Sequence, residues 1–164
     1  IYWHVGSRDD LITALVERLG ASYADTPVAG ATPHERVMAV ARQVWSNALA
    51  HPEVTRLAHQ HGAASLLQIH LEVALARELN AAGLSGAAGR DALRAILVGV
   101  GGFLVLALRP PDTVPVERAG TTLWQGIDDE AVDPAMQRAL TEPVDLDALF
   151  ERTLSAIVTA HLPT

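Results

Sequence analysis

The sequence predicts an all-α fold, and three observations support this prediction. Apolar residues recur at helical spacing along most of the 164 residues, whereas no stretch has the alternating pattern of a half-buried strand. Aromatic residues make up only 4% of the chain, while alanine occurs 28 times. The core is therefore expected to form from aliphatic helix faces that pack closely through small side chains. The length fits a single domain.

Capping residues and a proline define the first two helices. Ser7 is followed three positions later by Asp10, a short-acid variant of the capping box, so a helix is expected to begin there. The next helix is expected over 33–51, because Thr32 can cap its start and Pro52 disfavours helix in the residue before it.

The remaining helices follow from apolar stripes bounded by glycine and proline. A helix near the middle of the chain is apolar around most of its circumference, so neighbours must cover it on several sides. Its internal Gly99, Gly101 and Gly102 each weaken a helix by roughly 1 kcal/mol relative to alanine, which indicates close approach by another helix. The expected ranges are 52–61, 66–79, 90–108, 116–127, 133–140 and 146–161.

The charge distribution limits where nucleic acid could bind. The net charge is -7, and residues 110–164 carry ten acids against three arginines, whereas residues 1–109 carry nine of each. The bulk of the chain therefore lacks a basic face, so any DNA contacts must come mainly from residues before or just after Ile1. Because the chain opens without a methionine, we expect the natural polypeptide to extend upstream.

The sequence offers no anchor for enzyme chemistry. The absence of cysteine excludes thiolate catalysis and fits a reducing compartment. His59 and His61 are two residues apart and would point in opposite directions on a helix, so they cannot share a metal. No serine lies in a nucleophile-elbow pattern, and neighbouring carboxylates occur only as adjacent residues. We therefore expect no catalytic site, no metal and no cofactor.

The opening segment and two apolar helices carry more information. Tyr2, Trp3 and His4 suit a helix end that faces phosphate oxygens, with Arg8 at the next helix start; alternatively, they pack as a stub on the domain. The helices over 90–108 and 146–161 are too apolar for one subunit of this size to cover, which favours a self-complementary helical interface.

The segment IYWHVGSRDDLITAL resembles the boundary between the recognition helix and the regulatory core in the TetR family of bacterial transcriptional regulators. The family pattern LYxHFxxKxxLxxAL aligns with Tyr2, His4, Arg8, Leu11 and Leu15, with arginine in the usual lysine place. The YWHV run is similar to the tetracycline-repressor branch in particular. His59 lies near the place where that branch coordinates drug-bound magnesium, but its surroundings do not match.

The resemblance implies a TetR-type helical regulatory core with a dimerising four-helix bundle. Residues 1–6 would end the DNA-binding helix-turn-helix, most of which is missing from the sequence, and residues 7–164 would form the ligand-binding and dimerisation domain. DNA-contacting residues would be Tyr2, Trp3, His4 and Arg8. The dimer interface would include Leu93, Leu97, Gly101, Leu146, Leu149, Phe150, Leu154, Ile157 and Val158.

The expected function is that of a cytoplasmic, homodimeric, ligand-responsive regulator, most often a repressor that a small, largely apolar effector releases from operator DNA. His61, His70 and Gln68 would orient the ligand inside an apolar pocket. The pocket candidates, each of which could equally be plain core, are Trp45, Leu49, Leu57, His61, Leu67, Gln68, His70, Leu71, Val100, Phe103, Leu104 and Trp124. The alternative is an all-α ligand carrier or small enzyme unrelated to DNA.

Overall fold

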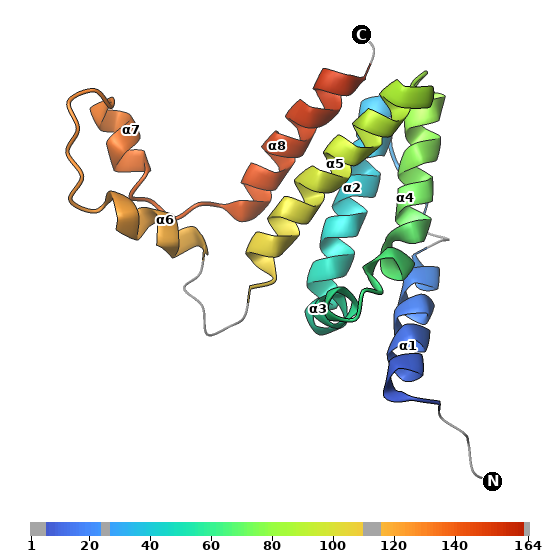
Figure 1. Cartoon of the computed structure of the whole chain (residues 1–164). Coiled ribbons are helices and arrows are strands. Elements are labelled where there is room, and N and C mark those ends of the chain that lie inside the picture. Colours follow the sequence, from blue (N-terminus) through green and yellow to red (C-terminus); the bar gives the residue numbers. More distant parts are fainter. Residues whose placement is uncertain (1–5, 24–26, 110–115, 163–164) are drawn as a thin grey trace.

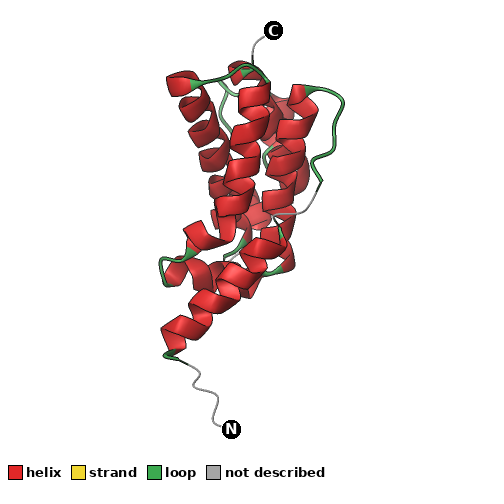
Figure 2. Ribbon diagram, turned by 90° about the vertical axis from the view of Figure 1, so that its right-hand side faces the viewer, coloured by secondary structure: helices red, strands yellow, loops and turns green. Residues whose placement is uncertain are grey.

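The computed structural model of the chain describes residues 6–23, 27–109 and 116–162, and these residues form helices without any strand (Figures 1 and 2). The predicted all-α fold class is thereby confirmed. The helices are α1 (Arg8–Ser22), α2 (Pro33–Ala50), α3 (Pro52–Gln60), α4 (Ala64–Ala81), α5 (Gly86–Ala107), α6 (Val116–Trp124), α7 (Pro134–Ala139) and α8 (Leu146–His161).

Side-chain caps fix several helix starts where the sequence predicted them. The Ser7 hydroxyl accepts the Asp10 backbone N–H at 3.2 Å, while the Asp10 carboxylate accepts the Ser7 N–H at 2.8 Å. The same reciprocal pair links Thr32 and Glu35 at the start of α2. These bonds satisfy N–H groups that have no partner within the helix.

The start of α5 differs from the prediction. The helix begins at Gly86, four residues before the expected Arg90. Gly86 has a φ of 55°, a conformation that glycine adopts without steric cost, and the alanines that follow favour helix. The glycine-rich segment therefore turns the chain at its first residue and then continues as helix.

The main core lies among α2, α4, α5 and α8. Three aromatic side chains fill its centre: Trp45 stacks on Phe150 with ring centroids 4.8 Å apart, and Phe103 meets Phe150 edge-on at 5.4 Å. Offset and edge-on ring pairs each add about 0.5–1.5 kcal/mol beyond area burial. These three aromatic side chains thus hold α2, α5 and α8 together in the main core.

A second, smaller core attaches α1 to the bundle. Ile12 and Val16 of α1 pack with Ala58 of α3 and with Leu67 of α4. Gly20 makes the α1–α4 approach close, because a Cβ at this position would lie 2.5 Å from the Leu66 carbonyl oxygen. In Figure 1, α1 lies at one end of the molecule, beside α3 and the start of α4.

The glycines of α5 face two different surroundings. A Cβ at Gly99 would lie 3.0 Å from the Ile157 side chain, so this glycine allows α5 and α8 to pack closely within the chain. A Cβ at Gly101 or Gly102 would meet no described atom within 4 Å. The expected approach of another helix is therefore found at Gly99 within the chain, but not at Gly101 and Gly102.

The segment that carries α6 and α7 projects away from the bundle (Figure 1). Leu123 and Met136 on it are exposed by 73% and 57%. Within the described ranges, no helix combines the length and hydropathy that crossing a membrane requires.

Candidate ligand-binding site

A cleft of about 280 Å³ opens between α3, α4 and α5. Its apolar wall comes from α5 and the residue that follows it, and its polar wall comes from the side chains of α3 and from Gln68 of α4. Pockets that bind small ligands combine such apolar surfaces with a few polar groups. The lining residues are Arg56, His59, Gln60, Gln68, Gly101, Leu104, Val105 and Leu108.

A smaller, more enclosed compartment adjoins the cleft. The two share Gln68 and Leu104 as lining residues. The compartment holds about 20 Å³, which is enough for one water-sized group. Its lining residues are Tyr23, Val44, Asn47, Ala48, Thr55, Leu67, Gln68, Leu71 and Leu104.

Three residues that line these hollows each carry a buried polar atom with no hydrogen-bond partner among the described residues. The atoms are the Tyr23 hydroxyl oxygen and Asn47 Nδ2, from residues of the compartment, and Arg56 Nε, from a residue of the cleft. Buried polar groups in folded proteins are nearly always paired, because an unpaired donor costs about 1–3 kcal/mol. The concentration of all three atoms on two adjoining hollows therefore singles out this place as a candidate binding site.

Other polar groups on these walls are already paired. The Thr55 hydroxyl donates to the His51 carbonyl at 3.0 Å. His59 Nδ1 lies 2.9 Å from the Thr55 carbonyl oxygen, which can only accept, so Nδ1 donates this hydrogen bond. Arg56 Nη1 donates to the exposed Glu53 carboxylate at 2.8 Å. Arg56 Nε is the buried donor of this guanidinium that has no partner among the described residues.

The compartment lies where the two cores meet. Tyr23 packs against both clusters, and Leu67 belongs to the smaller core that holds α1. Burial raises the pKa of the Tyr23 hydroxyl, which keeps this group protonated and able to donate. A ligand in the compartment would therefore touch side chains that position α1 as well as side chains of the main bundle.

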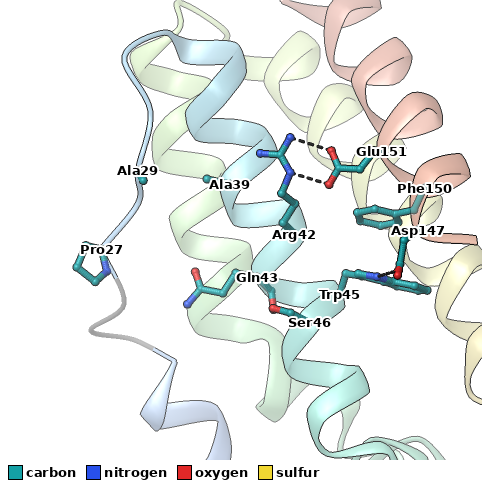
Figure 3. A pocket seen from close by; sticks show the side chains of 10 residues that line it. All are labelled: Pro27, Ala29, Ala39, Arg42, Gln43, Trp45, Ser46, Asp147, Phe150 and Glu151. Carbon is teal, nitrogen blue, oxygen red and sulfur yellow. Dashed lines mark hydrogen bonds and ion pairs between the residues drawn. The ribbon is translucent and has the colours of Figure 1, made fainter.

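A second hollow lies between α2, α8 and the segment before α2 (Figure 3). This open groove has a volume of about 410 Å³. Arg42 and Glu151 on its wall form a bidentate ion pair with nitrogen–oxygen distances of 2.6 and 2.8 Å, and Trp45 Nε1 donates to Asp147 at 3.0 Å. The hydrogen bonds to the Glu151 carboxylate raise the pKa of Arg42 above its ordinary value. Because these groups satisfy one another, the groove is a weaker candidate than the cleft.

Four of the predicted pocket residues line the cleft or the compartment, namely Leu67, Gln68, Leu71 and Leu104. Gln68 is the one predicted polar group that lies there. His59, left without a role by the sequence, also lines the cleft. No group of three or more metal-ligating side chains is found in the described part of the chain.

The other predicted pocket residues lie elsewhere. His61 and His70 are exposed, which corrects their predicted place inside an apolar cavity; His61 Nδ1 lies 3.6 Å from Asp9 Oδ1 instead. Val100 and Phe103 pack in the main core. Trp45 also belongs to the main core and lines the groove of Figure 3. The remaining three are outside both hollows: Leu49 is exposed, Leu57 packs in the smaller core, and Trp124 lies on α6.

Tyr23, Asn47, Thr55 and Arg56 were not among the predicted pocket residues. Asn47 offered one usable signal, because it interrupts the apolar stripe of α2 between Val44 and Ala48. A polar residue at such a position on a helix faces the interior and needs a partner.

The residues predicted to contact DNA are only partly described. Tyr2, Trp3 and His4 lie outside the described residues. Arg8 is the first residue of α1 and is exposed.

The predicted dimer residues divide into two groups. Phe150, Leu154 and Val158 are at most 1% exposed and pack inside the chain, so their predicted place on a dimer surface is corrected. The other six are partly buried: Leu93, Leu97, Gly101, Leu146, Leu149 and Ile157. The outward face of α5 carries Val98 and Val105, exposed by 74% and 71%, on either side of Gly102. These exposed residues were absent from the predicted interface.

Of the comparisons with known proteins, the one with solved structures identifies the fold. No protein-family model and no curated protein sequence matches the chain. Among solved structures, the chain is similar to the transcriptional regulator SCO7222, a TetR from Streptomyces coelicolor, with a TM-score of 0.74 and 20% sequence identity. The similarity covers 100% of this chain and 82% of the Streptomyces protein. The predicted fold is thus confirmed: the chain has the TetR fold.

Proposed function

We propose that the chain is the regulatory part of a homodimeric, DNA-binding transcriptional regulator of the TetR type, without enzyme activity of its own. The observation that carries this proposal is the TetR fold over the whole chain, combined with a cleft and an adjoining compartment that share residues with the core that holds α1. The described part holds no metal-ligating cluster and no paired catalytic groups in the cleft, so a binding role explains the site better than catalysis.

A small effector in the cleft and compartment would control α1. Tyr23 and Leu67 belong to the core that fixes α1, and Gly20 holds α1 against α4. A ligand shifts a conformational equilibrium only through different affinities for the two states. The compartment, with room for about 20 Å³, must widen to take more than a water-sized group, and this widening would move the side chains on which α1 rests.

The homodimer would form through the outward face of α5. Val98 and Val105 are exposed there, and Gly102 between them allows close approach of a second backbone. A two-fold interface on this face places the same residues of both subunits opposite one another. The two α1 helices would then present paired DNA-binding segments, and the effector would change their spacing. The regulator is proposed to be a cytoplasmic repressor that its effector releases.

A gel-shift assay tests the DNA-binding part of the proposal. The intact gene product is expected to retard DNA from the region that flanks its gene. Arg8→Ala should weaken binding several-fold on every DNA sequence, because a phosphate contact carries no sequence information. Arg18→Ala, a change further along α1, serves as the matched control. Saturable ligand binding by a protein that never retards the flanking DNA would favour the carrier alternative and refute the regulator.

A further inference from the structure

The lining of the cleft and compartment carries positive formal charge and no negative formal charge. Arg56 is the one formally charged residue on these walls, and no aspartate or glutamate lines either hollow in the described residues. The groove of Figure 3 differs, because Asp147 and Glu151 lie on it together with Arg42. A cationic ligand would therefore find no anionic partner in the cleft, whereas an anionic ligand would find an arginine.

All three unpaired groups can donate a hydrogen bond. Arg56 Nε and Asn47 Nδ2 are donors only, and the Tyr23 hydroxyl can donate. Arg56 is also fixed in place: its Nη1 bonds Glu53, whose own side chain is 80% exposed, while the guanidinium side chain is 30% exposed and its Nε is buried. A positioned guanidinium with a free buried N–H suits a carboxylate, because charge-assisted bonds to carboxylate oxygens are about twice as strong as neutral ones.

The remaining walls limit the rest of the ligand. Leu104, Val105 and Leu108 give the cleft an apolar side, and Leu67 and Leu71 continue it into the compartment. The cleft volume of about 280 Å³ lies just below the usual range for ligand pockets, about 300–1,000 Å³. The space therefore fits a small molecule with one compact apolar body.

We infer that the cleft binds a small apolar carboxylate, with the charged end at Arg56 and the apolar body against the leucines of α4 and α5. This inference rests on the proposed function only in naming the effector, since the binding site itself is argued from the described side chains. Asn47 and Tyr23 add donors in the adjoining compartment for an oxygen or a water beside the ligand.

Calorimetric titration with three probes of equal chain length tests the inference. Octanoate, 1-octanol and octylamine are added separately to the intact protein at neutral pH, without DNA. Octanoate is expected to bind once per chain, at least tenfold more tightly than the alcohol and with the amine weakest. Equal binding of acid and alcohol, or tighter binding of the amine, would overturn the inference while leaving the gel-shift test of the regulator unaffected.

Two variants at the same ion pair sharpen the test. Arg56→Met keeps an unbranched apolar side chain at this position but removes the guanidinium, so it should weaken octanoate binding about tenfold while leaving octanol binding unchanged. Glu53→Gln removes the competing carboxylate but keeps the guanidinium, so it should bind octanoate as tightly as wild type or up to a few-fold more tightly. Arg56→Gln replaces Arg56→Met if the latter unfolds. Unchanged octanoate affinity in the Arg56 variant would refute the assignment.

Discussion

Three unpaired polar atoms define the candidate site at the residue scale, and they explain why sequence reasoning found only part of it. Leu67, Leu71 and Leu104 could be named in advance because they belong to apolar helical stripes. Arg56 could not, since an arginine three residues after a glutamate on a short polar helix looks like a surface residue until its neighbours are known, whereas Asn47 left a signal in the apolar stripe of α2. Conversely, His70 looked like a pocket group by spacing alone, but the packing of α4 leaves it exposed.

Tyr23→Phe is expected to raise the free energy of unfolding by about 1 kcal/mol at neutral pH, because it removes a buried hydroxyl without a partner. Burial raises the pKa of Tyr23, so the neutral form is favoured in the folded state. The preference of the folded state for neutral Tyr23 contributes to the free energy of unfolding below the unfolded pKa of about 10, and this contribution is lost as pH rises through the folded pKa. In alkali, the variant should therefore lose less stability than wild type. Urea unfolding at neutral and alkaline pH checks both effects; a less stable variant at neutral pH would show that the hydroxyl is well paired.

At the scale of single elements, local sequence signals placed most helix ends correctly. The capping pairs at Ser7 and Thr32 and the proline after His51 act within a few residues, so they can be interpreted without the tertiary fold. The start of α5 was misplaced because glycine permits both a turn and a helix. The burial of Phe150 and its neighbours in α8 was also misjudged, since an apolar stripe does not say whether α5 of the same chain or of a partner covers it.

The α1–α4 contact is the element-scale feature that the proposed regulation requires. Gly20→Ala should destabilise the protein by about 1–3 kcal/mol, because the added methyl group meets the Leu66 carbonyl, which is backbone and cannot turn aside. In the Gly20 variant, amide hydrogen exchange in α1 should be faster than in wild type, and the increase should be larger in α1 than in α2. Glu17→Ala, an exposed change on the same helix, should stay within about 0.5 kcal/mol of wild type. Wild-type exchange rates in the Gly20 variant would contradict the close approach.

At the scale of the whole molecule, the outward face of α5 predicts opposite effects on chain stability and on dimerisation. Gly102→Ala should favour helix in each chain by about 1 kcal/mol, since its Cβ meets no described atom within 4 Å. The same methyl group should weaken the dimer by keeping the two α5 helices apart. Analytical ultracentrifugation over a dilution series measures the dimer, with Arg77→Ala on α4 as control. An unchanged or tighter dimer in the glycine variant would place the interface elsewhere.

The spacing between the two α1 helices of a dimer tests the central claim most directly. The chain has no cysteine, so Glu17→Cys on the exposed side of α1 provides a single spin-label position. Pulsed electron resonance then measures the distance between the two labels, with and without whichever compound of the acid, alcohol and amine series binds most tightly. We expect one distance in the free dimer and a clearly different one when the compound is bound. If no dipolar coupling between labels on two subunits is detected, or if the distance between the labels is identical with and without the compound, the protein is not a ligand-controlled dimeric regulator.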